Sequence, residues 1–268
     1  MTGWQKTVKY LAMAFAIFLS VSIISGICGG IASLSFLFGH SNGGGQMQNY
    51  PVRGDVKELI IDISAADLSI ETGDDFRVES NHKYLNVKES DGKLFISEDR
   101  NGFLSNAEGT HLYIYIPEDM HFTYAEVNTG AGSVKIDELS TDVIELELGA
   151  GEVQIGKLTA EKVAEINGGA GELTIRDGLL HNMELDMGVG ELNLTGRILG
   201  KSSLDYGIGE AGVTLLGTEE DYQIRLDKGI GEATLEGESM RDDSVYGSGD
   251  NQIEIDGGIG ELHITFRE

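Results

Sequence analysis

The chain has 268 residues, of which 40% are hydrophobic, and this is enough for one large folded domain or two small ones. Its 45 acidic residues outnumber its 19 lysines and arginines, and the net charge of −26 excludes charge-driven binding of nucleic acids as a main role. The single cysteine, Cys28, excludes an intramolecular disulfide framework and a zinc site built from cysteines.

The N-terminal segment predicts a membrane anchor. Residues 10–39 contain no charged side chain, and a helix of about 20 apolar residues is enough to cross a bilayer. Lys6 and Lys9 precede this segment, which favours a cytoplasmic N-terminus at residues 1–9 and an extracytoplasmic C-terminal domain. The alternatives are a buried core helix and a cleaved signal peptide, whose apolar run is usually only about 7–15 residues long. We therefore expect one transmembrane α-helix at residues 10–39.

A linker and a set of short strands follow the predicted anchor. Residues 40–50 include three consecutive glycines and predict a flexible spacer. Residues 51–128 predict an N-terminal β-strand region that caps the rest of the domain, with Asp91-Gly92 between two apolar runs as the signal of a β-hairpin. The other strand-like segments are residues 59–63, 68–70, 76–78 and 111–117.

The C-terminal half contains an internal repeat, seen in LGAGEVQI (148–155) and MGVGELNL (187–194). Seven copies occur, at steps of 19, 20, 19, 19, 22 and 29 residues. Their first glycines are Gly130, Gly149, Gly169, Gly188, Gly207, Gly229 and Gly258. Residues 64–70 resemble an eighth, degraded copy. Such a period predicts an all-β, single-domain β-solenoid, with stacked coils of about 19–20 residues over residues 129–268.

The two glycines of each copy predict a corner in each coil. Hydrophobic residues alternate on both sides of the glycines, so both strands can face one core only if the chain turns between them. A residue without a Cβ permits the backbone angles that such a turn needs. The alternation also assigns the residue between the glycines to the core. Its growing size predicts either a core that widens along the chain or partner residues that become smaller. These residues are Ala131, Ala150, Ala170, Val189, Ile208, Ile230 and Ile259.

An acidic residue follows the second glycine in six copies. These corner acids are Glu152, Glu172, Glu191, Glu210, Glu232 and Glu261. Carboxylates stacked at ~4.8 Å repel by about 0.9 kcal/mol in water, so three roles are open: solvated or N–H-capping turn residues, a ladder that binds divalent cations, or catalysis. We favour the first, because the row is uniform and the six histidines are scattered along the sequence. We expect no catalytic residue, no cofactor and no metal site.

Residues 55–268 resemble the bacterial β-strand-repeat family of putative adhesins, which is related to toast-rack domains. The resemblance rests on IDISAADLSIETGDDFRVE, on the strand and turn YIYIPED, and on the GAGEVQI-type repeats. It implies a β-solenoid at the bacterial cell envelope, often behind one membrane helix. The family has no established catalytic residues, so the resemblance implies none here.

Together these features predict a single-pass protein of the cell membrane whose extracytoplasmic β-solenoid is an interaction, adhesion or envelope-sensing module without catalytic activity. The alternative is a carbohydrate-active enzyme on a β-helix scaffold. The expected partners of the protein are the membrane, through residues 10–39, and an envelope or neighbouring membrane protein. Residues 257–264 are expected to end the stack and to leave an unpaired edge. We therefore expect a mainly monomeric protein, with weak self-association through that edge.

Overall fold

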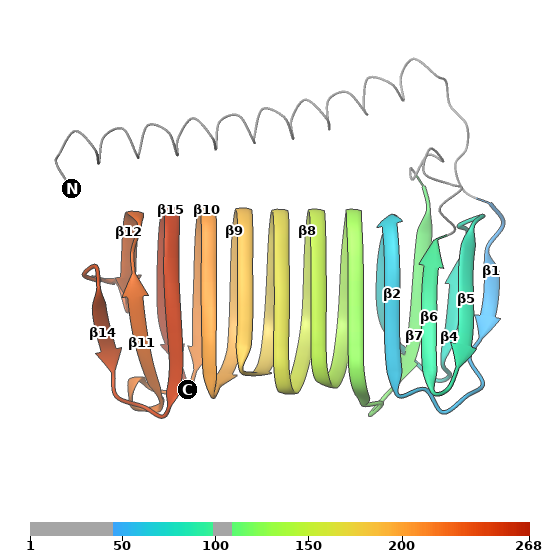
Figure 1. Cartoon of the computed structure of the whole chain (residues 1–268), viewed down its shortest axis with the longest axis horizontal. Coiled ribbons are helices and arrows are strands. Elements are labelled where there is room, and N and C mark those ends of the chain that lie inside the picture. Colours follow the sequence, from blue (N-terminus) through green and yellow to red (C-terminus); the bar gives the residue numbers. More distant parts are fainter. Residues whose placement is uncertain (1–44, 99–108) are drawn as a thin grey trace, which may run out of the picture. The chain divides into compact units, whose positions relative to one another are not determined.

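The computed structural model describes residues 45–98 and 109–268, and the predicted membrane segment at residues 10–39 lies outside them. Within the described residues, no helix is both long enough and apolar enough to cross a membrane. This part of the chain consists of β-strands and turns (Figure 1), including one 3₁₀ turn, η2 (Glu219–Asp221). The all-β class expected from the sequence is confirmed.

Seven strands form the N-terminal region. One sheet edge is built from β1 (Gln48–Pro51), β4 (Arg77–Ser80), β7 (His111–Pro117) and β3 (Asp67–Gly73), in that order, and β3 pairs with the first coil of the solenoid. The other edge is built from β5 (Leu85–Ser90), β6 (Lys93–Glu98) and β2 (Glu58–Ala65). The β5–β6 pair is the predicted hairpin, and both turn residues have positive φ, 55° at Asp91 and 76° at Gly92. β1 includes three residues, 48–50, of the predicted linker.

The solenoid continues through β8 (Phe122–His181), β9 (Met183–Leu199) and β10 (Lys201–Leu216), and Figure 1 shows their coils side by side. The coils are parallel and in register, so that equivalent residues of successive repeats stack on one another. Ala65 pairs with Ala131 and Leu68 with Val134, which confirms that residues 64–70 are an eighth copy of the repeat.

The second glycine of each copy lies at the predicted corner. Gly190 has a φ of 144°, which strongly favours glycine. A Cβ at this position would also overlap the carbonyl oxygen of Gly171 in the neighbouring coil. The corner glycines are therefore required both by the backbone conformation and by the close stacking of the coils.

The expectation that the residue between the glycines enters the core is wrong. Leu148 and Val153 are both buried, 7% and 6% exposed, and the four residues between them turn around the outside of the corner. Ala150 is therefore exposed, and the equivalent Ile230 is 47% exposed. The increase in side-chain size along the chain occurs on the outer surface and says nothing about core width.

The expected order of the last coils is also wrong. β11 (Tyr222–Asp227) and β12 (Ile230–Leu235) form the end coil, which β14 (Ser244–Gly247) and β13 (Glu238–Ser239) cover by antiparallel pairing. β15 (Asn251–Arg267) then returns and pairs with β10 on one side and with β11 and β12 on the other (Figure 1). The last repeat in the sequence is therefore an internal coil, and no unpaired edge exists where the sequence analysis expected it.

Asn251 connects this inserted strand to both of its neighbours. The Gly200 N–H donates to Asn251 Oδ1 at 3.1 Å, and Asn251 Nδ2 donates to the carbonyl oxygen of Asp221 at 3.0 Å. Further along β15, Ile255 and Ile264 are 2% and 1% exposed and extend the hydrophobic core. The insertion is thus fixed by hydrogen bonds at its start and by packing along its length.

Candidate functional site

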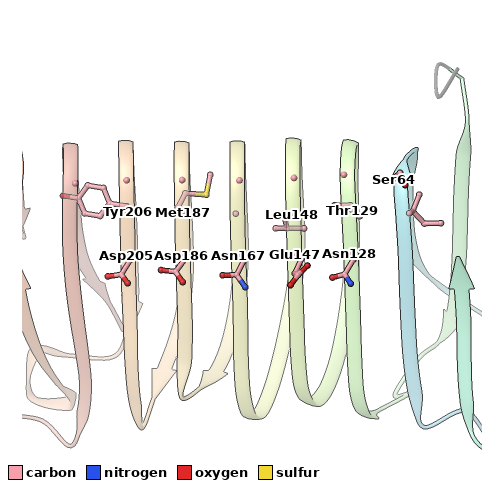
Figure 2. A pocket seen from close by; sticks show the side chains of 18 of the residues that line it. Ser64, Asn128, Thr129, Glu147, Leu148, Asn167, Asp186, Met187, Asp205 and Tyr206 are labelled. Carbon is pink, nitrogen blue, oxygen red and sulfur yellow. The ribbon is translucent and has the colours of Figure 1, made fainter. Parts of the chain in front are cut away.

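A groove of about 1020 Å³ crosses the coils just before the glycine corners (Figure 2). Each coil contributes three consecutive residues to the groove: a polar residue, a residue of variable size at an inward position, and then the first glycine of the repeat, which is replaced by Ser64 in the degraded copy. The glycines have no side chain to fill the outer surface, so the groove remains open along the stack. Figure 2 shows the polar side chains of five coils in a single row. The polar residues, here named the groove column, are Asp62, Asn128, Glu147, Asn167, Asp186, Asp205 and Asp256.

In the floor of the groove, a large side chain from one coil packs against a glycine of the neighbouring coil. Met187 pairs with Gly168, and a Cβ on Gly168 would overlap the Met187 sulfur. Tyr206 pairs with Gly257, where a Cβ would lie 2.6 Å from the Tyr206 hydroxyl. Met187 and Tyr206 are only 7% and 5% exposed, so they close the floor while the polar groove column forms its side.

The groove column carries a concentrated negative charge. Asp186, Asp205 and Asp256 occupy equivalent positions in three adjacent coils, because Asp205 pairs with Asp186 on one side and with Asp256 on the other. Burial, followed by hydrogen bonding with Asp186 and the charges of Asp186 and Asp256, raises the pKa of Asp205 from 3.8 to about 6. Its Oδ1 atom is buried with no hydrogen-bond partner in the described residues. The groove is therefore strained by charge repulsion that a cation or a proton would relieve.

The corner acids form a second column on the outside of the solenoid. Pairing brings Glu172, Glu191 and Glu210 into register and then places Glu261 beside Glu210 and Glu232 beside Glu261. All of them except the half-buried Glu172 are exposed. Several accept a hydrogen bond from the residue two positions later, as Glu191 does from Asn193 at 2.8 Å. This exposure is what the favoured interpretation, solvated turn residues, requires.

The groove column was not predicted from the sequence. Six of its members lie two residues before the first glycine of a copy, Asp62 lies two residues before Ser64, and they vary among Asp, Asn and Glu. The signal was present, because a polar residue recurs at that position in a repeat whose neighbouring positions are apolar or glycine. What could not be read from the sequence is that the glycines leave the surface hollow there.

A second surface contains aromatic residues from β7. Tyr113 and Tyr115 are stacked with ring centroids 6.4 Å apart, and the Arg77 guanidinium carbon lies 3.8 Å from the centre of the Tyr115 ring. Arg77 Nε also donates to Glu79 at 2.9 Å. Burial and the charge of Glu71 raise the pKa of Tyr115. The polar groups of this surface bind one another, so it offers fewer unsatisfied groups to a ligand than the groove does.

Residues 56–257 match the family described as Toastrack DUF4097. A putative cell adhesion protein from Clostridium sporogenes is 15% identical, with a TM-score of 0.35 over 83% of this chain and 99% of that one. A putative adhesin from Bacteroides fragilis is 12% identical, with a TM-score of 0.37 over 81% and 95%. A putative lipid binding protein from Parabacteroides distasonis is 14% identical, with a TM-score of 0.37 over 85% and 98%.

No curated protein sequence matches the chain. The family match covers most of the chain, from just before β2 into β15, and so includes most of the repeats and corners described above. The chain therefore belongs to the Toastrack DUF4097 family.

Proposed function

We propose that the protein is a membrane-anchored, extracytoplasmic interaction module that binds an extended cationic ligand, such as a lysine- or arginine-rich polypeptide segment, along the groove. The observation that carries this proposal is the charge of the groove. Five of its lining residues are acidic and none is basic among the described residues: Asp62, Glu147, Asp186, Asp205 and Asp256.

The dimensions of the groove match an extended chain. Its column spans seven positions from Asp62 to Asp256, and coils of a β-solenoid are spaced by about 4.8 Å. Six steps correspond to about 29 Å, which is the length of about eight or nine residues at 3.3–3.4 Å per residue. A cationic segment of this length would place a charge opposite the acids of several coils at once. It would also relieve the repulsion around Asp205.

The anchor and the location complete the proposal. Residues 10–39 span the cell membrane once, residues 1–9 are cytoplasmic, and the solenoid lies on the extracytoplasmic side as a mainly monomeric module. The module is an interaction or adhesion protein without catalysis of its own, and its partner is an envelope or membrane protein with a basic segment. Support comes from the uncharged N-terminal segment with its preceding lysines, and from the family to which the solenoid belongs.

The groove is tested with a fluorescent nine-residue peptide rich in lysine, added to the full chain in a mild detergent. The double variant Asp186→Asn/Asp256→Asn should weaken binding by about 10-fold or more at low salt, because two charge contacts are lost. The matched control, Glu191→Gln/Glu232→Gln, removes the same charge from exposed corner acids outside the groove. Equal losses in both double variants would show that binding follows net charge alone and would contradict the proposal.

The location is tested by labelling intact cells with a membrane-impermeant maleimide. In a Cys28→Ser background, a cysteine at the exposed Lys201 position should be labelled, whereas a cysteine at Thr7 should react only after the cells are permeabilised. Labelling of the Thr7 position alone would reverse the proposed topology.

A further inference from the structure

Several corner acids accept a hydrogen bond from a side chain of their own coil, and Glu210 lacks such a donor. Thr174 Oγ1 donates to Glu172 at 3.2 Å, and Asn193 Nδ2 donates to Glu191 at 2.8 Å, each from two residues later in the same coil. In the next coil the equivalent residue is Gly212, which has no side chain. Glu210 therefore has no donor from that position.

A histidine from another part of the chain lies at this place. His263 pairs with Gly212 because β15 is inserted beside β10, although the two residues are far apart in the sequence. His263 Nε2 lies 3.4 Å from Glu261 Oε2 and 4.0 Å from Glu210 Oε1. The missing side chain of Gly212 lets one imidazole face two carboxylates from adjacent coils.

The other imidazole nitrogen is already occupied. His263 Nδ1 lies 2.9 Å from Thr234 Oγ1, on β12. When Nδ1 carries the proton and donates it to Thr234, the Nε2 lone pair faces Glu210 and Glu261. Histidines that bind metals are usually oriented in this way, by a hydrogen bond from their second nitrogen.

We propose that Glu210, Glu261 and His263 form a binding site for a divalent transition-metal ion, for which Zn²⁺ is the best match. Their three ligand atoms lie within 4.8 Å of one another. Tetrahedral zinc with bonds of about 2.0–2.2 Å separates its ligand atoms by about 3.3–3.6 Å. The exposed side chains therefore need to close their separations by at most about 1.5 Å to complete the site. One imidazole with two carboxylates favours such an ion over Ca²⁺, which takes six to eight oxygens.

A second group of similar composition is less suitable. His121, Asp142 and Glu161 also bring three ligand atoms within 4.8 Å. However, the Lys162 ammonium donates to Asp142 at 2.9 Å. A fixed positive charge thus already neutralises Asp142. This group serves as an internal control, because it also combines one histidine with two carboxylates, but one of its carboxylates is paired with a lysine.

The test is a calorimetric titration of ZnCl₂ into the full chain, purified in detergent without a polyhistidine tag. We expect one equivalent of Zn²⁺ to bind at the high-affinity site and to raise the melting temperature by mass action. His263→Gln and Glu210→Gln should each weaken this binding by about 10-fold or more, and Thr234→Val by about 10-fold with the stoichiometry unchanged. All these side chains are at the surface, so circular dichroism should show unchanged folding.

Two controls define the result. His121→Gln and Glu172→Gln should change the zinc affinity by less than about 2-fold, since neither residue is in the site. A 10-fold excess of CaCl₂ should leave zinc binding in place. No zinc binding, binding that survives His263→Gln, or a loss of binding with His121→Gln would overturn the proposal. So would displacement by calcium, which would indicate a diffuse acidic surface. Peptide binding in the groove is measured without zinc, so each proposal can fail alone.

Discussion

The substitution Asp205→Asn should stabilise the protein at neutral pH. Asp205 lies between Asp186 and Asp256, its Oδ1 is buried without a partner, and its pKa is raised from 3.8 to about 6. A neutral amide removes the repulsion and keeps the shape of the side chain. The solenoid already carries amides at this column position, since Asn128 and Asn167 occupy it in other coils.

The size of the effect follows from the pKa. A group whose pKa is raised on folding favours the folded state below its unfolded pKa, and this stability is lost as the pH rises through the folded pKa. The shift from 3.8 to about 6 corresponds to about 3 kcal/mol at pH 7.5, and solvent screening of this partly exposed carboxylate reduces the effect to about 1–2 kcal/mol. For a domain of this size, the melting temperature should rise by about 3–8 °C. At pH 4.5 the folded wild type is mostly protonated at Asp205, so about two-thirds of the advantage should vanish.

The assay is thermal unfolding of wild type and variant at pH 7.5 and pH 4.5, followed by circular dichroism. The control is Asp62→Asn, which removes a charge from the exposed end of the same column, next to Asn128. It should change the melting temperature by less than about 2 °C at either pH. If Asp205→Asn gives no increase at pH 7.5, or the same increase at both values of pH, the proposed strain in the groove column is wrong.

Three further substitutions or deletions test the fold. Gly190→Val should cost about 3 kcal/mol or more in free energy of unfolding, because Gly190 has a positive φ and a side chain there would overlap the neighbouring coil. The control is Gly178→Ala, whose Cβ meets only ordinary contacts of 3.4 Å or more. Equal melting temperatures for the two variants would contradict the corner argument. Deletion of residues 264–268 should lower the free energy of unfolding by at least about 3 kcal/mol, because Ile264 is buried inside an internal coil. A truncated chain with wild-type stability in urea would show that β15 is not inserted there. Asn251→Ala should lower the free energy of unfolding by about 1–3 kcal/mol, because it removes the hydrogen bonds to both neighbouring coils. An unchanged urea midpoint would show that these hydrogen bonds do not fix the inserted strand.

The repeating part of the fold could be predicted because one short pattern sets both the period and the backbone. The spacing of the glycines predicts one coil per copy, and their positive φ values agree with the predicted corner. The Asp91-Gly92 turn is equally local, since two residues determine the hairpin. These features depend on neighbouring residues in the chain, which a sequence displays directly.

The order of the last coils could not be predicted, because similar repeats can stack on one another in more than one order. The pattern at residues 257–264 pairs as well with residues 206–215 as with residues 228–235, and the structure uses both pairings. The long step of 29 residues before Gly258 was the only sign that the chain leaves the stack and returns. The contact of His263 with Glu210 depends on this insertion, so the spacing of these two residues in the sequence does not reveal it.

The position of the residue between the glycines was missed for a different reason. The alternation rule assumes an extended strand, but the chain around Ala150 turns through four outward-facing residues before Val153 enters the core. The groove depends on the same turn, because it is the shape of the corner that leaves the groove column beside a row of glycines. If the geometry of one corner had been known, both the outward position of Ala150 and the groove could have been predicted.

The most direct test of the proposed function is site-specific photo-crosslinking in intact cells. Benzoylphenylalanine replaces Asn167, within the groove column, or Val163, which is 38% exposed and lies outside the groove on the same strand. We predict a defined cross-linked protein from the Asn167 position, and its yield should fall when Asp186→Asn/Asp256→Asn is added. Cross-links from the Val163 position alone, or a yield from Asn167 that is indifferent to the loss of the two carboxylates, would contradict a partner bound in the acidic groove.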